Sequence, residues 1–453
     1  MKKPITILSF LLAFAVNAQT NPAITSWLQN TTGISGRHYI IGNSTPIIDA
    51  IAANVQSVKY DINWAYVAAT GIPAYITGPF QDGNPSLATA QNKIFKMPLN
   101  PTQNTGTATA TTGGNIGIFI NGVALFDYRD GVAWSSATNA LCGGPGNPPC
   151  AGGMGATQAW NRDAIPAERA GFDCSKAHPA MGNYHHHQNP SAFNLDLNVL
   201  STVCGTYPSD ALYVINPNQH SPLLGFTYDG FPIYGAFAYT NTDGTGPITR
   251  IKSSYQLSTN TTRLNGPSIN QVVGKQTMFN GYFREDYQYV AHPGDSTYLD
   301  SHNGRICNTP EYPILLYPNG IYCYFATVDA NYNSAYPYVV GPTFYGNKTA
   351  TTVITVPAGT TTYLSDNTFN FDTLKVVIAP NPAQDFIAIQ SQMVENDLKV
   401  ELVNELGQII KTSKILQGST LSIIETDAVY NGIYFVKISS DKDSKSFKVI
   451  IKK

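Results

Sequence analysis

Three of the eight histidines of this 453-residue chain fall in the run Tyr184-His185-His186-His187, which follows Gly182 closely. In an extended strand the side chains alternate, so His185 and His187 would share one face while Tyr184 and His186 share the other. Imidazole is a common protein ligand for zinc, copper, iron and nickel, so two imidazoles on one face form half of a metal site. The competing interpretation is a turn whose rings only hydrogen-bond within a polar core.

Further candidate ligands come from two other segments. His178 precedes His185 by a stretch that contains a glycine turn, which would fold it back against the strand. His302 and Asp300 lie far along the chain beside the turn-forming Asn303, at the expected end of a strand. The alternative for both is a turn in which Asp300 caps backbone amides. The predicted metal ligands are His178, His185, His187, His302 and Asp300, a set that suits zinc or copper better than calcium.

The residues predicted to surround these ligands are Tyr184, His186, Asp229 and Asn303. Asp229 precedes Gly230 in a turn signal, so it either shapes a turn or faces the site as a carboxylate. Asp229 and Asp300 would suit an acid–base pair, but the sequence gives no distance between them. Because no serine-hydrolase elbow, zincin helix, phosphate loop or dinucleotide fingerprint is recognisable, no reaction is assigned and catalysis stays an open question.

The N-terminus has the layout of a secretory signal. Lys2 and Lys3 precede an apolar stretch over residues 5–16, and small residues end at Ala18. The apolar stretch falls short of the roughly 20 residues that span a bilayer, and no other segment approaches that length. We therefore expect residues 1–18 to be removed, and we expect no transmembrane segment.

The composition argues against nucleic acid as a partner. Charged residues make up only 12% of the chain and the net charge is −2. No basic stripe supplies the phosphate-neutralising attraction that nucleic-acid binding requires.

The six cysteines all lie between residues 142 and 323, and an even number in an exported chain favours disulfides. We predict the local pairs Cys142 with Cys150 and Cys307 with Cys323. Cys174 would then pair with Cys204 and bracket the histidine run. The alternative makes Cys174 a thiolate metal ligand beside His178.

Short runs rich in Val, Ile, Tyr, Phe and Thr, separated by Gly, Pro and Asn, are typical of β structure. We predict a mainly β protein with a large loop-rich β domain stapled by disulfides, followed by a small C-terminal β-sandwich. The clearest predicted strands cover residues 55–67, 116–125, 211–215, 322–328 and 353–356, and short helices are expected near 46–53 and 164–170. The abundant tyrosines are expected mainly to fill the core, with sugar stacking as the alternative.

The composition changes towards the C-terminus. Charge density rises and cysteine and histidine vanish after residue 376, which predicts a separate small sandwich of seven or so strands. The expected organisation is a signal peptide over 1–18, a β domain over 19–347, a Thr-rich connector over 348–375 and the final module over 376–453.

That final module resembles the type A sorting domain of the type IX secretion system of Gram-negative bacteria of the Bacteroidetes group. The matching blocks are residues 379–385 (APNPAQD), 404–408 (NELGQ), 431–436 (NGIYFV) and 447–453 (FKVIIKK). An aromatic residue is usual where Ala379 stands. The resemblance implies recognition by the outer-membrane type IX machinery, and release from the cell or attachment to its surface.

The central region resembles the YHYH domain family, with His186 at the position where the name has Tyr. The supporting blocks lie between residues 71 and 345: 71–73, 120–125, 173–178, 184–187, 229–235, 299–305, 320–325 and 336–341. The family is defined by sequence and implies no particular reaction.

Together these features predict a secreted or cell-surface protein with a histidine-rich transition-metal site. Two alternatives remain. The site would be catalytic in a metal-dependent hydrolase or oxidase that acts on an extracellular polymer, or the protein would be a surface binding or adhesion module without chemistry, with an extracellular glycan or polymer as ligand.

Overall fold

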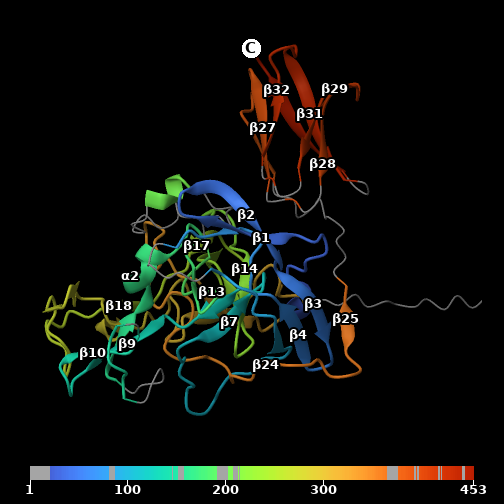
Figure 1. Ribbon diagram of the computed structural model, residues 1–453. Coiled ribbons are helices and arrows are strands. Elements are labelled where there is room, and N and C mark those ends of the chain that lie inside the picture. Colours follow the sequence, from blue (N-terminus) through green and yellow to red (C-terminus); the bar gives the residue numbers. More distant parts are fainter. Residues whose placement is uncertain are drawn as a thin grey trace, which may run out of the picture. The chain divides into compact units, whose positions relative to one another are not determined.

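The computed structural model describes residues 21–80, 87–144, 146–151, 158–190, 202–207, 213, 215–364, 376–391, 394, 397–416, 419, 421–440 and 444–453. The chain divides into two compact units, one ending at Leu364 and one running from Ser365 to Lys453 (Figure 1). The predicted signal peptide lies outside the described residues. Both units are built mainly from strands, as predicted.

The largest sheet of the N-terminal unit is mixed and has eight strands. Their order is β12 (His178–Ala180), β13 (Asn183–His186), β8 (Ala124–Phe126), β7 (Asn115–Phe119), β14 (Leu223–Thr227), β15 (Pro232–Tyr234), β23 (Ile321–Phe325) and β22 (Gly304–Cys307). Strands β13 and β8 pair in parallel, as do β15 and β23, and the other neighbours are antiparallel. The predicted strand over 116–125 is in fact the antiparallel pair β7–β8, and the strand predicted over 322–328 corresponds to β23, which ends at Phe325.

A five-stranded antiparallel sheet forms the second large layer. Its order is β24 (Thr351–Val353), β6 (Lys93–Pro98), β4 (Trp64–Ala69), β3 (Val55–Tyr60) and β25 (Thr361–Tyr363). The predicted strand over 55–67 is in fact the hairpin β3–β4, because Asp61 accepts hydrogen bonds from the backbone N–H groups of Asn63 and Trp64 and closes a turn there. Strands β24 and β25, from the expected connector, pair with the two edges of this sheet.

Smaller sheets complete the unit. They are β2 (Asn43–Ala52), β1 (Ser35–Ile40) and β5 (Ile76–Thr77); β10 (Ala140–Cys142), β9 (Arg129–Ser135) and β11 (Trp160–Asp163); β16 (Phe237–Tyr239) and β17 (Ile248–Arg250); β18 (Tyr255–Leu257) and β21 (Tyr287–Tyr289); and β19 (Val272–Val273) and β20 (Gln276–Thr277).

The helix expected near residues 46–53 is wrong, because this segment is part of the edge strand β2. The β-branched residues Ile47 and Ile48 favour a strand, and an edge position tolerates Pro46, which lacks a backbone N–H. The helix expected near 164–170 is confirmed. It consists of α2 (Ala164–Glu168), whose N-cap Asp163 accepts a hydrogen bond from the Ile165 N–H, and the 3-10 turn η2 (Arg169–Gly171).

The remaining helical elements are short: α1 (Pro22–Thr25), η4 (Thr202–Gly205) and η5 (Arg284–Asp286). The strand predicted over 211–215 lies mostly outside the described residues. Of the strand predicted over 353–356, only Val353 belongs to a strand, β24.

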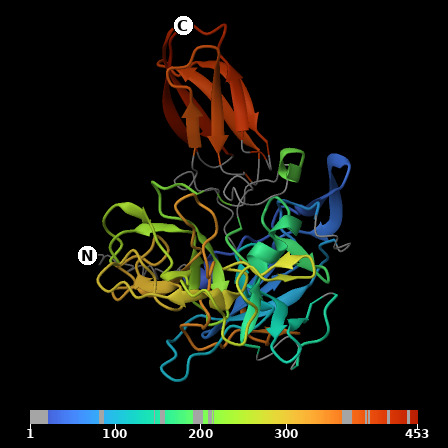
Figure 2. The same cartoon turned by 90° about the vertical axis from the view of Figure 1, so that its left-hand side faces the viewer.

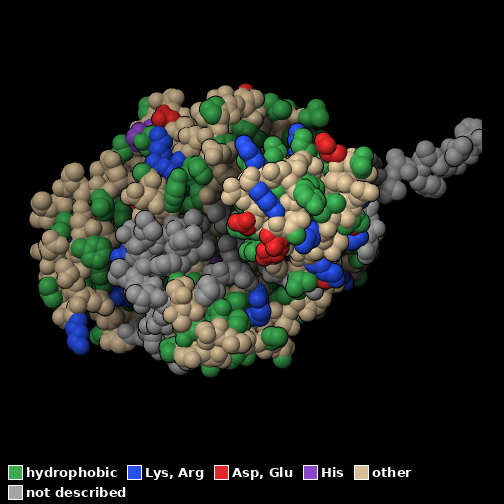
Figure 3. Space-filling view, turned by 90° about the horizontal axis from the view of Figure 1, so that it is seen from above, with side chains coloured by type: hydrophobic (Ala, Val, Ile, Leu, Met, Phe, Trp, Pro, Cys, Tyr) green, Lys and Arg blue, Asp and Glu red, His purple; other side chains and the backbone are tan. Residues whose placement is uncertain are grey.

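Aromatic side chains fill the core of the N-terminal unit, as the sequence predicts. Its largest fully buried side chains include Tyr128, Tyr184, Tyr234, Tyr324, Phe119, Phe172, Phe226, Phe283, Phe325 and Phe344. The surface carries few charges, and the face in Figure 3 is mostly uncharged, with Lys and Arg interspersed among Asp and Glu.

The C-terminal unit is the predicted small sandwich (Figure 2). One sheet has the order β26 (Val376–Ala379), β27 (Phe386–Ser391) and β30 (Leu421–Glu425), and the other β29 (Ile409–Ile415), β28 (Leu398–Asn404), β31 (Gly432–Ser439) and β32 (Ser444–Ile451). Burial alternates along β31, where Val436 and Ile438 are completely buried. These side chains belong to the unit's own hydrophobic core.

Candidate metal centre

A tight hairpin brings two of the predicted ligands face to face. Strands β12 and β13 are antiparallel, and His178 stands directly opposite His185. Met181 and Gly182 form the turn with φ values of 48° and 82°, the left-handed pair typical of a two-residue hairpin. A Cβ at Gly182 would collide with Thr89 Oγ1. The glycine turn that the sequence predicts is therefore required by both conformation and space.

The predicted alternation along the histidine run is also found. His185 and His187 turn to the side of His178, while Tyr184 and His186 pack on the other side. His186 Nε2 lies 2.7 Å from the Tyr75 hydroxyl. Two chemically different environments thus flank one strand.

His178, His185 and His187 form a compact cluster. One ring nitrogen from each lies within 4.8 Å of those of the other two, and the Nε2 atoms of His185 and His187 are 3.1 Å apart. All three side chains are buried. Within the described part of the chain, this is the set of His, Cys, Asp and Glu side chains whose geometry could hold a metal ion.

The hydrogen bonds of the other ring nitrogens fix how the cluster presents its lone pairs. His185 Nδ1 lies 2.9 Å from the carbonyl oxygen of Asn183, and His187 Nδ1 lies 2.6 Å from that of Asp127. A carbonyl only accepts, so each Nδ1 carries the proton and each Nε2 of a neutral ring carries a lone pair. Two lone pairs then face each other at 3.1 Å, an arrangement that a shared cation would stabilise.

His185 itself does not readily accept a proton. Burial lowers the pKa of His185 well below its usual value, and the neighbouring rings of His187 and His178 lower it further. Charging this ring would place an imidazolium in a desolvated pocket. A metal ion bound to both nitrogens leaves the imidazoles themselves neutral, and coordination compensates its own charge.

Glu168, which the sequence analysis did not single out, supplies an oxygen to the same cluster. It is the last residue of α2, and its Oε2 lies 3.3 Å from His178 Nε2 and 3.3 Å from His187 Nε2. This oxygen is buried, and no described group approaches it with the alignment of a hydrogen bond. Burial raises the pKa of the carboxyl, whereas His178 and His187, when they carry a proton on the nitrogen that faces it, lower that pKa far below its usual range.

Three of the distances among these four ligand atoms suit a tetrahedral ion, and the ring nitrogens of the three histidines lie within 4.8 Å of one another. Ligand atoms bound to zinc at about 2.0–2.2 Å lie about 3.3 Å from one another. The contacts of His185 with His187, of Glu168 with His178 and of Glu168 with His187, at 3.1, 3.3 and 3.3 Å, already meet that spacing. Three imidazoles and one carboxylate are a donor set for zinc and also for copper.

Two phenylalanines hold the rings in place. Phe126 stacks on His185 with ring centroids 3.8 Å apart, and Phe172 meets His178 edge to face at 4.9 Å. Phe172 also lies parallel to His187 at 6.2 Å. These apolar walls restrict the imidazole rotamers and limit access of water to the nitrogens.

The structure does not bring His302 and Asp300 into this cluster. They precede β22, the edge strand opposite β12 in the eight-stranded sheet. Asp300 accepts hydrogen bonds from the N–H groups of His302 and Gly304 and from the Tyr322 hydroxyl, while His302 Nδ1 contacts Thr343 Oγ1 at 2.8 Å. This corresponds to the capped turn that the sequence left open as the alternative.

The carboxylates near the run also serve the fold. Tyr184 donates to Asp173 Oδ2 at 2.8 Å, and Asp173 holds the loop before β12 through the N–H groups of Ser175 and Ala177. Asp229, in the turn between β14 and β15, accepts from the Tyr324 hydroxyl and the Gly346 N–H.

Asn303 also acts away from the cluster. It adopts a positive φ and donates to the carbonyl oxygens of Phe325 and Val339. Of the residues expected to surround the ligands, Tyr184 and His186 thus lie on the strand that carries His185, whereas Asp229 and Asn303 do not.

Two of the three predicted disulfides form: Cys142–Cys150 and Cys174–Cys204. The latter excludes Cys174 as a thiolate ligand. Cys307 and Cys323 are buried free thiols, which corrects the third pairing. The register pairs Cys307 with Ile321 and Arg305 with Cys323, so the cysteines are diagonal neighbours on adjacent strands, and their thiols interact without forming a bond.

Comparison with known families agrees with both resemblances. Residues 94–337, more than half of the chain, match the YHYH protein family and include the whole histidine hairpin and Glu168.

The chain belongs to the YHYH protein family.

Residues 377–452 of this YHYH protein match the secretion system C-terminal sorting domain, over nearly all of the C-terminal unit. The sorting domain supports export to the cell surface or beyond. No match to a curated protein was found. Within the described residues, no helix is long and apolar enough to cross a membrane.

Proposed function

We propose that this YHYH protein is exported and binds one transition-metal ion, zinc or copper, through His178, His185, His187 and Glu168. The observation that carries the proposal is the contact of 3.1 Å between the Nε2 atoms of His185 and His187, whose Nδ1 atoms are both engaged by backbone carbonyls. The buried Glu168 oxygen beside the same cluster supplies the compensating negative charge.

The test is elemental analysis of the purified full chain after exposure to Zn²⁺ or Cu²⁺ and removal of free metal. We expect one ion per chain in the parent protein and none in the His185→Ala/His187→Ala variant. A His38→Ala/His292→Ala variant, which alters two histidines outside the cluster, should retain the ion. A parent protein without bound metal under these conditions would reject the proposal.

The coordination and the exposure of the ligands bear on the role of such an ion, which is either structural or catalytic. With Glu168 bound, four protein ligands close the coordination sphere, which is characteristic of a structural site. The side chain of Glu168 is 23% exposed, whereas those of His178 and His187 are 8% and 3% exposed. Glu168 is therefore the ligand at which exchange would take place, once its buried Oε2 moves away from the metal.

The partial exposure of the Glu168 side chain favours a second candidate, a metal-dependent hydrolase or oxidase that acts on an extracellular polymer. A bound ion with an exchangeable position polarises substrate or activates water. Cobalt-substituted protein provides the test: azide changes the visible spectrum only if a ligand position can exchange. An unchanged spectrum in both the parent protein and a Glu168→Ala variant would exclude the catalytic role and leave the structural one.

The sorting domain supports the cellular part of the proposal. We expect passage through the periplasm, recognition by type IX secretion machinery, and a final location outside the cell or on the outer surface of a Gram-negative bacterium.

A further inference from the structure

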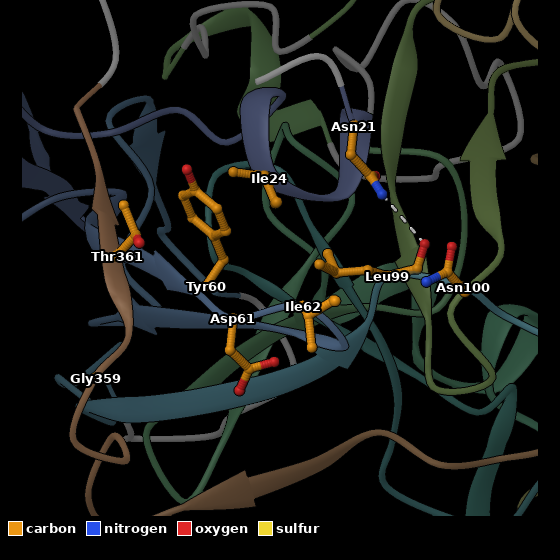
Figure 4. A pocket seen from close by; sticks show the side chains of 9 residues that line it. All are labelled: Asn21, Ile24, Tyr60, Asp61, Ile62, Leu99, Asn100, Gly359 and Thr361. Atoms are coloured by element: carbon orange, nitrogen blue, oxygen red, sulfur yellow. Dashed lines mark hydrogen bonds between the residues drawn. The ribbon is translucent and has the colours of Figure 1, made fainter. Parts of the chain in front are cut away.

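A second cavity lies in the N-terminal unit, at one end of the five-stranded sheet. It has a volume of about 520 Å³, within the range of about 300–1,000 Å³ that is usual for small-molecule sites. Figure 4 shows its wall, which is formed by the end of β3, the following turn, the segment after β6 and the edge strand β25. None of the candidate metal ligands lines it.

One side of this cavity is apolar. The ring of Tyr60 faces the hollow, with Ile24 and Leu99 around it (Figure 4). Ile62, at the tip of the β3–β4 turn, is 85% exposed. An aromatic ring beside aliphatic side chains offers a flat surface for the C–H face of a ring-shaped polar ligand.

Uncharged hydrogen-bonding groups surround this apolar surface. Thr361 stands directly opposite Tyr60 in the pairing of β25 with β3, so both side chains project from the same side of the sheet. Asn100 adds an amide. Within the described residues, the hydroxyls of Tyr60 and Thr361 and the amide of Asn100 have no side-chain hydrogen bond, and each of these groups both donates and accepts.

The other polar residues in the wall maintain its shape. Asn21 donates to the Leu99 carbonyl at 3.2 Å. Asp61 accepts from the Asn63 and Trp64 N–H groups and from the Tyr66 hydroxyl at 3.0 Å. The one carboxylate is therefore already engaged, and no Lys or Arg lines the cavity. Such a wall favours a neutral ligand over a phosphate, sulfate or uronate.

From these features we propose that the cavity binds a neutral saccharide, of the size of a mono- or disaccharide unit within an extracellular glycan. Hydroxyl groups of the sugar meet Asn100, Thr361 and the Tyr60 hydroxyl, and its apolar face lies against the Tyr60 ring. The site is independent of the metal centre, so the protein would combine glycan attachment with metal binding on one exported domain.

The experiment is affinity electrophoresis of the full chain in native gels that contain laminarin, soluble starch, galactomannan or xylan, with alginate as the anionic comparison. We expect at least one neutral polysaccharide to retard the protein. Tyr60→Ala should weaken retardation by about tenfold or more, and Asn100→Ala and Tyr60→Phe by smaller factors, because each removes one hydrogen-bonding group. Tyr289→Ala, which alters an exposed tyrosine outside this cavity, should leave it unchanged.

The proposal would be overturned by no retardation by any of the neutral polysaccharides, or by retardation that Tyr60→Ala and Asn100→Ala both leave intact. Retardation should survive EDTA and the His185→Ala/His187→Ala substitution. If EDTA and the His185→Ala/His187→Ala substitution each abolish retardation, the glycan binds through the metal centre and the assignment to this cavity is wrong. Asn100 is exposed, so its substitution tests the site without disturbing the core.

Discussion

His187 Nδ1 lies 2.6 Å from the carbonyl oxygen of Asp127. The next carbonyl along the chain, that of Tyr128, accepts a hydrogen bond of 2.8 Å from the N–H of Ala164 at the start of α2. One short backbone segment therefore orients an imidazole and anchors the helix that carries Glu168. The geometry of the candidate metal centre depends on this segment as well as on its ligands.

Replacing Glu168 with Gln should weaken metal binding while the histidines stay in place. The change removes the charged oxygen that lies 3.3 Å from two imidazoles. We expect affinity for Zn²⁺ to fall by at least about tenfold, since even groups behind the ligands contribute this much. Competition with a chromophoric chelator measures the affinity. The matched control is Glu405→Gln at an exposed glutamate, and equal affinities for the two variants would count against Glu168 as a ligand.

Gly182→Ala should disrupt the β12–β13 hairpin. Gly182 has a φ of 82°, and a new Cβ would meet Thr89 Oγ1. The left-handed conformation alone costs about 1–2 kcal/mol for a residue with a side chain. Gly33→Ala is the control, because Gly33 has a φ of 76° with open space around it. Urea denaturation should show the larger loss for Gly182→Ala, with weaker metal binding, and equal losses would show that the contact with Thr89 is unimportant.

Chelation should destabilise the N-terminal unit. A ligand that binds only the folded state stabilises it by about 4 kcal/mol when its free concentration is a thousand times the Kd. Thermal unfolding followed by circular dichroism should therefore give a lower Tm after treatment with EDTA, and a recovered Tm after Zn²⁺ is added back. In the His185→Ala/His187→Ala variant EDTA should have no effect; a similar drop there would trace the effect to another ion.

Stability of the metal-free protein should decrease with rising pH because of Asp163. Burial raises the pKa of this carboxyl from 3.8 to about 8, although Tyr338 donates a hydrogen bond to it. Between these two pKa values the folded state keeps a proton that the unfolded chain releases. The free energy of unfolding therefore falls as pH rises, by at most about 1.4 kcal/mol per pH unit. Asp163→Asn should flatten this dependence in urea denaturation, whereas an unchanged slope would assign it to other groups.

The C-terminal unit should carry the export signal by itself. A fusion of residues 376–453 to a periplasmic reporter should reach the cell surface or the medium in a bacterium with type IX secretion machinery. Val436→Asp places a charge in the buried core of this unit and should block export, while Leu416→Asp at an exposed position should not. Export of the reporter without the fused unit, or of the Val436→Asp variant, would contradict this role.

The local part of the candidate site could be predicted from the sequence. Alternation along a strand places His185 and His187 on one side, and a glycine turn of two residues sets His178 opposite His185. Both rules depend on residues close together in the chain. For the same reason, the three- and four-stranded sheets of the C-terminal unit agree with the predicted sandwich of seven or so strands.

Contacts between distant segments were decided only by the tertiary structure. Glu168 joins the cluster because α2 is anchored at Tyr128, whereas His302 precedes the opposite edge strand of the sheet. The register of β22 with β23 likewise makes Cys307 and Cys323 diagonal neighbours, and they remain free thiols. Strand order and register are set by burial of the common core, which involves the whole chain. The composition and spacing near any one residue therefore do not determine them.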